Sequence, residues 1–372
     1  MSCGGTQSLA AITLRFSCPN RDGVLISLSM RIYPLPHLPH LPARRFLAVA
    51  LPMLLACSPK GDDKPVIGLI TKTASNPFFV KMKEGAEQAA AAQGATLIAA
   101  AGRSDGDNAG QVTAIENLMA AGAKAILISA SDAKAIVPAI TKARDAGILV
   151  IALDSPTDPV DATDALFATD NYRAGVLIGE YAKARLGATP AKIATLDLIP
   201  GNPTGAQRHN GFLSGFGLAS YDKSRNELAQ PPEVVCMTDA MGDQAKGQTA
   251  MENCLQAHPD INVVYTVNEP SAAGAFNALQ KAGKEKGVLV VSVDGSCRGV
   301  QNIVRGALTA TAQQYPLRMA ELGVEAAMAF IKSGKKASGY MDTGVQLIAK
   351  ESVAGVVTLG ASEALGLCWG DK

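Results

Sequence analysis

The chain has 372 residues, of which 48% are hydrophobic and 5% aromatic, and its 36 glycines are typical of an α/β protein with a sizeable core and room for two domains. Its 34 lysines and arginines nearly balance 33 aspartates and glutamates, which leaves a formal net charge of +1. Because there is no bulk positive field to attract nucleic acid, we expect no nucleic-acid partner.

Residues 1–57 are interpreted as a leader, because they do not share the pattern of the rest of the chain. Two arginines precede the apolar run Phe46–Ala56, which has the length of a signal-peptide core and is too short to span a bilayer. The letters Leu-Leu-Ala-Cys at 54–57 resemble the bacterial lipoprotein box, which implies export and acylation of Cys57. The alternative is an ordinary cleavable signal in which Cys57 is incidental.

Two further features concern the boundaries of this leader. Residues 1–29 show no clear period, and Met30 begins a more usual signal peptide, so a start-site error before Met30 is a second interpretation of these residues. Residues 58–64 are polar and are interpreted as a tether between the leader and the folded protein.

From residue 65 to residue 170 apolar runs alternate with helical patterns, which predicts βαβ units on a parallel sheet. The expected strands are Val66–Lys72, Thr96–Gly102, Ala125–Ser129, Leu149–Asp154 and Leu166–Asp170. The expected helices are Pro77–Gln93, Ala109–Ala120 and Ala133–Ala146. This region therefore accounts for one complete α/β domain.

The first strand-to-helix junction carries the residues around which we expect the site to be built. Asn76 is a suitable N-cap and Pro77 suits the first helical position, so the helix should begin at the carboxyl end of the strand, where ligands of open α/β sheets bind. Phe78 and Phe79 cannot both point into the same core, so at least one should face the crevice as a platform for a sugar ring. The alternative is a capped helix with two core aromatics.

The pattern then repeats, which predicts a second domain of the same kind. The expected strands are Lys192–Ile199, Glu233–Thr238, Val263–Asn268, Val288–Asp294 and Leu308–Gln314. The expected helices are Arg173–Leu186, Thr204–Gly217, Asp243–His258, Pro270–Ala282 and Arg298–Gly306. A helix from Pro316 to about Lys332 and a strand over Tyr340–Leu347 should then return to complete the earlier sheets.

Four cysteines lie beyond the leader, and an exported chain meets an oxidising compartment, so Cys236, Cys254, Cys297 and Cys368 are candidates for two disulfides. Three pairings are possible in principle, and Cys236 with Cys254 is preferred because the first ends a strand and the second lies on the following helix. The sequence has no Cys-x-x-Cys and its histidines do not cluster, so we expect no metal site.

Apolar runs in both domains finish in a polar residue at the edge where a doubly wound sheet presents its crevice. These residues are Ser129, Asp154, Asp170, Asn268, Asp294 and Gln314. Each alone could be a helix cap or a turn residue, but together they offer donors and acceptors suited to a polyol. The junctions carry neither a dinucleotide nor a phosphate-binding glycine pattern, and no nucleophile elbow, which predicts a binding protein without a cofactor rather than an enzyme.

Several motifs together resemble the periplasmic sugar-binding proteins of the ribose/galactose type, from Pro65 to about Gln346. They are Asn76–Phe79, Ile151–Asp154, Ala168–Asn171, Arg208–Phe212, Val267–Glu269, Val293–Gly295 and Gln314–Pro316. The stretches Gly242–Asn253, Ser292–Gly295 and Gln313–Pro316 are similar to the fructose-type members.

The resemblance implies an α/β fold of two Rossmann-like lobes with parallel sheets, joined by a three-strand hinge. Residues 65–170 and 315–343 would form the N-terminal lobe, and residues 171–314 and 344–372 the C-terminal lobe. The hinge crossovers are expected near residues 170–171, 314–315 and 344–345.

The resemblance also implies which residues contact the ligand. They are Asn76, Phe78, Phe79, Ser129, Asp154, Arg208, Asn268, Asp294 and Gln314. Two positions depart from the family, because Ser129 replaces an asparagine and Ser155 replaces the arginine that often follows Asp154. The aromatic that the second lobe of family members often contributes aligns near Gly242, so that stacking is absent here or supplied elsewhere. Trp369, the single tryptophan, is expected to pack the tail rather than to contact ligand.

The function implied is that of a monomeric exported substrate-binding protein, lipid-anchored in the periplasm or cell envelope, that delivers a monosaccharide to an ABC importer permease. Fructose is favoured, with ribose and mannose as alternatives. Service to a chemoreceptor is compatible with the same lobes, and a sugar-acting enzyme is a weaker alternative because clustered carboxylates can act as acid and base. A sugar-responsive transcription factor is disfavoured because residues 1–64 offer no helix-turn-helix.

Overall fold

The computed structural model describes residues 12–19, 25–32, 64–218 and 226–371, and the chain divides into the units Met1–Asp63 and Lys64–Lys372. In the first unit, β1 (Ile12–Pro19) and β2 (Leu25–Ile32) pair as an antiparallel hairpin, a structure that the sequence pattern did not reveal. The predicted signal-peptide core, Cys57 and nearly all of the tether lie outside the described residues.

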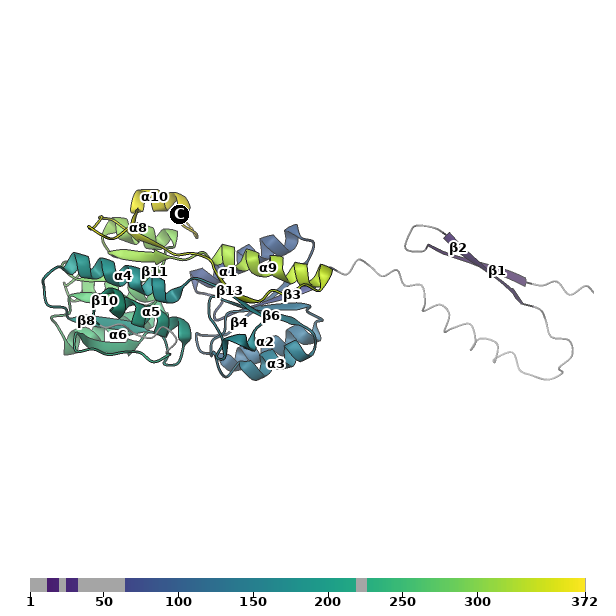
Figure 1. The fold of residues 1–372 in the computed structure, drawn as a ribbon, viewed down its shortest axis with the longest axis horizontal. Helices are drawn as coiled ribbons and strands as arrows, with labels where there is room; N and C mark the ends of the chain where they lie inside the picture. Colours follow the sequence, from purple (N-terminus) through teal and green to yellow (C-terminus); the bar gives the residue numbers. More distant parts are fainter. Residues whose placement is uncertain (1–11, 20–24, 33–63, 219–225, 372) are drawn as a thin grey trace, which may run out of the picture. The chain divides into compact units, whose positions relative to one another are not determined.

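The second unit contains two separate sheets with helices on both faces, as Figure 1 shows, which confirms the α/β prediction. The first sheet is entirely parallel, in the order β13-β7-β6-β5-β3-β4. Its strands are β3 (Val66–Thr71), β4 (Thr96–Ala101), β5 (Ala125–Ile128), β6 (Leu149–Leu153), β7 (Ala165–Ala168) and β13 (Gly339–Asp342). Helices α1 (Pro77–Ala92) and α9 (Pro316–Ser333) cover one face, and α2 (Asn108–Ala120) and α3 (Val137–Asp145) the other.

The second sheet has the order β15-β14-β12-β11-β10-β8-β9 and is parallel except between β12 and β14. Its strands are β8 (Ile193–Asp197), β9 (Val234–Asp239), β10 (Val263–Thr266), β11 (Leu289–Asp294), β12 (Ala310–Gln313), β14 (Gln346–Ala349) and β15 (Leu359–Gly360). Helices α4 (Asn171–Leu186) and α5 (Pro203–Gly215) cover one face. The other face packs against α6 (Gln244–Ala257), α7 (Glu269–Lys281), α8 (Cys297–Arg305) and α10 (Ala361–Leu367).

The chain passes from one sheet to the other after β7, after β12 and between β13 and β14. The single strand expected over Tyr340–Leu347 was wrong, because β13 and β14 belong to different sheets. Gly344 lies between them with φ of 93°, a conformation that a continuous strand cannot contain. The lobe boundaries at residues 170, 314 and 344 stay predictions, and we use the words first and second lobe for the two sheets with their helices.

Two other local expectations differ from the structure. Helix α3 begins at Val137 instead of Ala133, because Asp132 Oδ1 accepts hydrogen bonds from the backbone of residues 134 and 135 and forms a turn, and Pro138 then suits the first helical turn. The strand β15 and the helix α10 near the C-terminus were not predicted.

Both disulfides are present in the second lobe. Cys236 is bonded to Cys254, the pair that the sequence favoured, with 5.7 Å between their Cα atoms. Cys297 is bonded to Cys368, with 4.9 Å between Cα atoms. None of the helices in the described parts of the chain is both long and apolar enough to cross a bilayer.

Candidate functional site

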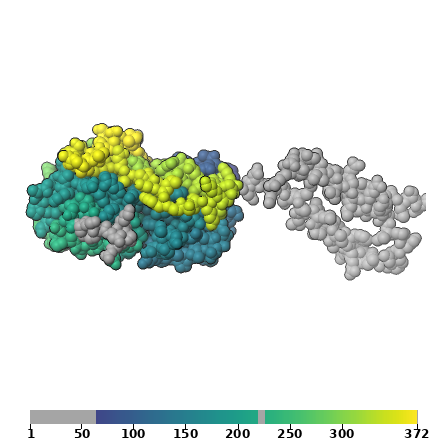
Figure 2. Space-filling model, viewed as in Figure 1, coloured from purple at the N-terminus to yellow at the C-terminus, as the bar shows by residue number. Residues whose placement is uncertain are grey.

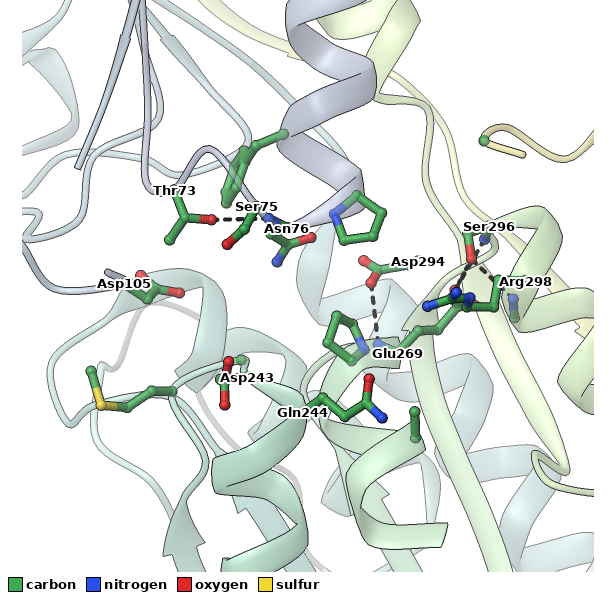
Figure 3. A pocket seen from close by; sticks show the side chains of 18 of the residues that line it. Thr73, Ser75, Asn76, Asp105, Asp243, Gln244, Glu269, Asp294, Ser296 and Arg298 are labelled. Carbon is green, nitrogen blue, oxygen red and sulfur yellow. Dashed lines mark hydrogen bonds between the residues drawn. The ribbon is translucent and has the colours of Figure 1, made fainter. Parts of the chain in front are cut away.

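Two adjoining cavities lie between the lobes, at the carboxyl ends of the parallel strands. The larger has a volume of about 590 Å³ and the smaller about 30 Å³, and both are lined by Asn76, Phe79, Asp105 and Asp294. Figure 3 shows the larger cavity, with Thr73, Ser75 and Asn76 from the first lobe and Asp243, Gln244 and Glu269 from the second. Its volume is in the range of roughly 300–1,000 Å³ that is usual for small-molecule sites.

Seven of the nine residues predicted to contact ligand line the smaller cavity. They are Asn76, Phe78, Phe79, Asp154, Arg208, Asn268 and Asp294. Gln314 lines neither cavity and lies behind the wall, in contact with Arg208 and Asp294. Ser129 also lines neither cavity, and its side chain is fully buried.

Arg208 forms the floor of the site and is 4% exposed. Its guanidinium donates to Asn171 Oδ1 at 2.7 Å, to the carbonyl of Val267 at 2.9 Å and to Gln314 Oε1 at 2.9 Å. It also lies 3.6 Å from Asp154 Oδ1. Four partners therefore hold the charged group in one orientation, as a buried guanidinium requires.

A close approach of two helices positions this arginine. A Cβ atom at Gly175 on α4 would lie 2.1 Å from the carbonyl oxygen of Arg208 on α5, so a side chain there would push the helices apart. The small residue thus allows α5 to pack against α4 at the depth that brings the guanidinium beneath the cavity.

The two predicted carboxylates adopt an unusual backbone conformation. Asp154 has φ of 63° and Asp294 has φ of 150°, and in the described chain Met241, which also lines the larger cavity, is the one other non-glycine residue with positive φ. Such conformations cost free energy and concentrate at functional sites. The backbone at these three places therefore supports the assignment of the cavity as a binding site.

The two carboxylates differ in how many of their oxygens accept hydrogen bonds from the described residues. Asp294 accepts from Gln314 Nε2 at 3.0 Å and from the backbone N–H of Glu269 at 3.1 Å. Asp154 accepts at Oδ2 from Ser155 Oγ at 3.1 Å, while its buried Oδ1 accepts no hydrogen bond from the described residues. Because buried oxygens are normally hydrogen-bonded, Asp154 Oδ1 is available to a ligand hydroxyl.

Glu269, which the sequence analysis missed, adds a third carboxyl to this region. Burial, together with the neighbouring Asp294 carboxylate, raises the pKa of Glu269 to about 8, although Ser296, Thr311 and the backbone of Gly295 donate hydrogen bonds that oppose the shift. Burial also raises the pKa of Asp294 to about 6, against the effect of Arg208. The second lobe therefore holds a proton-binding pair beside the cavity.

The amides and aromatics have mixed roles. Asn76 Oδ1 caps α1 by accepting from Phe78 N at 3.0 Å. Phe78 and Phe79 are both buried in the same core cluster, so the expectation that they could not share one core was wrong; their rings meet edge to face with centroids 5.3 Å apart, and both also line the smaller cavity. Asn268 caps α7 and also donates to the carbonyl of Gly242 at 3.0 Å. A Cβ at Gly242, where φ is +61°, would lie 2.8 Å from Asn268 Nδ2, so no aromatic can occupy that position without moving Asn268.

Sequence reasoning also missed an ion pair at the smaller cavity. Lys72 is 2% exposed and lies 3.9 Å from Asp105, and both line the smaller cavity. The position of Lys72 directly after β3 is the same strand-end signal that identified the other residues. Trp369 is buried as expected of a residue that packs the tail, and it also lines the larger cavity. The described residues hold no group of three or more His, Cys, Asp or Glu side chains suited to a metal ion.

Comparisons with known proteins find related binding proteins. A family model described as periplasmic binding protein domain matches residues 67–336. The ribose import binding protein of Bacillus subtilis is 33% identical over 292 residues, covering 76% of this chain and 90% of that protein. The ribose import binding protein of Salmonella typhimurium is 33% identical over 304 residues, covering 82% and 96%. A periplasmic solute-binding protein of an ABC transporter from Actinobacillus succinogenes, solved with bound D-allose, is 28% identical with a TM-score of 0.68, covering 77% and 98%.

Proposed function

The chain belongs to the periplasmic binding protein family, whose members bind substrates for transport and are not enzymes, and from this premise we propose that it captures a monosaccharide between its lobes and delivers it to an ABC importer permease. The relatives named for ribose import and the structure solved with D-allose support a sugar as the ligand. No covalent step is required of the residues that line the cavities.

The convergence of polar and aromatic side chains at one cavity carries this proposal. Arg208 supplies donors from the second lobe, while from the first lobe Asn76 offers an amide and Asp154 Oδ1 is a buried acceptor without a hydrogen bond from the described residues. A sugar hydroxyl can donate to a carboxylate and accept from a guanidinium at once, and hydrogen bonds to charged groups are the stronger ones. Phe78 and Phe79 can cover the apolar C–H face of the ring.

The choice among sugars rests on the differences from ribose-type members. Ser155 stands where an arginine often follows Asp154, and the buried Lys72 beside Asp105 offers a different cation at the smaller cavity. The similarity to fructose-type members over Gly242–Asn253 favours fructose, and ribose, allose and mannose are the competing ligands.

Calorimetric titration of the mature protein with free pentoses, hexoses and polyols tests the sugar assignment. We expect saturable one-to-one binding of at least one monosaccharide, with fructose among the tightest. Binding of an amino acid or a nucleotide, with no sugar bound, would overturn the proposal.

Ligand capture is proposed to close the lobes about the three crossovers between the sheets. A sugar that contacts both lobes stabilises the closed form by its differential affinity for that form, and the permease then recognises the closed shape. Small-angle X-ray scattering should therefore show a smaller radius of gyration when sugar is added. An unchanged radius at saturating sugar would contradict closure.

We also propose that the protein is exported and held at a membrane of the cell envelope through a lipid on Cys57, a residue outside the described part of the chain. The apolar run Phe46–Ala56 and the Leu-Leu-Ala-Cys letters support this. Mass spectrometry of the mature N-terminus would detect the acyl chains, and Cys57→Ser should release the protein from membranes. An unmodified mature N-terminus would instead support an ordinary cleavable signal.

A further inference from the structure

The C-terminal segment is fixed to the second lobe beside the larger cavity. Helix α10 contacts α8 (Figure 1), and Figure 2 shows the C-terminal residues, in yellow, on the surface of this lobe. The disulfide of Cys368 with Cys297 joins the end of α10 to the first residue of α8. The next residue, Trp369, accepts a hydrogen bond at its carbonyl from Cys297 N at 2.8 Å.

This anchoring directs the Trp369 side chain into the site rather than to solvent. The indole is 6% exposed and lines the cavity of about 590 Å³. Its Nε1 donates to the carbonyl of Gln314 at 2.8 Å and to the carbonyl of Asp294 at 3.2 Å. Its ring also meets Phe78 of the first lobe edge to face, with centroids 5.9 Å apart. The tail residue therefore contacts the strand ends of the second lobe and an aromatic residue of the first.

We propose that the disulfide-anchored C-terminal segment is part of the ligand site and that Trp369 is an aromatic wall that selects cyclic sugars over open-chain polyols. This inference rests on the proposed function, because the larger cavity that Trp369 lines adjoins the smaller one and shares Asn76, Phe79 and Asp294 with it. Gly242 cannot carry an aromatic without displacing Asn268, so the tail supplies an aromatic surface from the second-lobe side. A cyclic sugar presents a rigid face of C–H groups to such a ring, whereas an open-chain polyol presents hydroxyls in changing directions.

The indole donor is already satisfied by two backbone carbonyls, so it is not needed for a hydroxyl of the ligand. Trp369 can therefore offer ring surface to the ligand. We expect its contribution to the binding free energy to depend on the shape of the ligand more than on the ligand's hydrogen-bonding groups. This distinguishes a specificity-determining wall from packing of the tail, which would affect all ligands equally.

The test measures by calorimetry the affinities of wild type, Trp369→Phe and Trp369→Ala for matched pairs of ligands. Each pair consists of a cyclic sugar and its reduced, open-chain alditol. We expect Trp369→Ala to lower the affinity for the cyclic sugar by roughly threefold to tenfold and the affinity for the alditol by much less, with Trp369→Phe intermediate. Equal losses of affinity for both ligands, or no loss for either, would overturn the inference. Failure of wild type to bind any sugar would instead overturn the proposed function.

The disulfide offers a second test with a matched control. The double variant Cys297→Ser with Cys368→Ser should lose cyclic-sugar selectivity in the same direction as Trp369→Ala, whereas Cys236→Ser with Cys254→Ser should keep it. Circular dichroism establishes that each variant is folded before titration.

Because Trp369 is the single tryptophan, its fluorescence emission should also shift when sugar binds to wild type. Unchanged emission at saturating sugar, or equal selectivity in both double variants, would count against the wall.

Discussion

Arg208 Nη2 donates a hydrogen bond to Gln314 Oε1 at 2.9 Å, and so ties the floor of the cavity to the end of the strand that leads out of the second lobe. Gln314 in turn donates to Asp294 Oδ1 at 3.0 Å. The glutamine thus neutralises no charge itself but sets the relative positions of a guanidinium and a carboxylate. Gln314 therefore holds these two charged side chains together, and its direct contact with ligand stays a prediction.

We predict that Arg208→Lys folds but weakens sugar binding at least tenfold, because one ammonium cannot reproduce the contacts to Asn171, Val267 and Gln314. Arg208→Ala leaves Asp154 and its neighbouring carboxylates without this buried cation, and should lower the free energy of unfolding by about 3–5 kcal/mol. Calorimetry and urea unfolding measure the two effects.

The matched control for this prediction is Arg318→Ala. Arg318 is 54% exposed and pairs with Glu321 at the surface, so its loss should change unfolding by less than about 0.5 kcal/mol and leave sugar affinity unchanged. If Arg208→Ala behaved like Arg318→Ala, the floor assignment would be wrong.

Sequence reasoning could find Asp154 and Asp294 because parallel strands place their carboxyl ends at one edge, so a polar residue after each buried run reaches the same crevice. The same rule covers Lys72, but a lysine after a buried strand was not considered as a site residue. Trp369 gave no such signal, since its place depends on the disulfide of the preceding Cys368 to Cys297, two residues that are 71 positions apart. Ser129 also follows a buried strand, but its side chain is fully buried and lines neither cavity.

We predict that Lys72→Met weakens sugar binding roughly tenfold while leaving the fold intact, because the methionine fills the same space but cannot donate to a hydroxyl. Burial raises the pKa of Asp105, and Lys72 opposes that rise, so removal of the lysine should raise the pKa further. Calorimetry on Lys72→Met, Asp105→Asn and the double variant measures whether the two residues act together.

Lys83→Met is the control for this substitution. Lys83 is 53% exposed and pairs with Glu87 on the outer face of α1, so its replacement should leave affinity unchanged. Additive effects of the Lys72 and Asp105 substitutions would show that the pair does not act as one unit in the site.

The buried carboxyl pair predicts a stability that falls as pH rises. The pKa of Glu269 is raised from 4.5 to about 8, so the folded protein holds a proton that the unfolded chain has already released between these values. The free energy of unfolding should therefore decrease from about pH 5 to pH 8, at no more than about 1.4 kcal/mol per pH unit for each such group. Urea unfolding at four pH values measures the slope.

Glu269→Gln removes the titrating group and should make the slope shallower over the same pH range. Glu252→Gln is the control, because hydrogen bonds from Gln248 and Lys281 lower the pKa of that exposed carboxyl, which places its titration below this range. A profile that is flat in wild type, or that is equally steep in Glu269→Gln, would contradict the proton-binding role.

The two disulfides should contribute unequally to stability. Loss of a cross-link increases the entropy of the unfolded chain by an amount that grows with the enclosed loop, and the separations are 18 residues for Cys236–Cys254 and 71 residues for Cys297–Cys368. Chain-entropy arguments give about 3 kcal/mol for the shorter loop and about 4 kcal/mol for the longer.

Serine pairs at each disulfide, unfolded in urea without sugar, measure this difference directly. We expect the variant lacking Cys297–Cys368 to be less stable by about 1 kcal/mol than the variant lacking Cys236–Cys254. Saturating sugar should stabilise wild type and the Cys236–Cys254 variant by similar amounts, since a ligand stabilises the form that it binds. It should stabilise the Cys297–Cys368 variant less, because Trp369 is released from the site. The reverse order of stabilities would show that native-state strain, rather than loop length, governs these bonds.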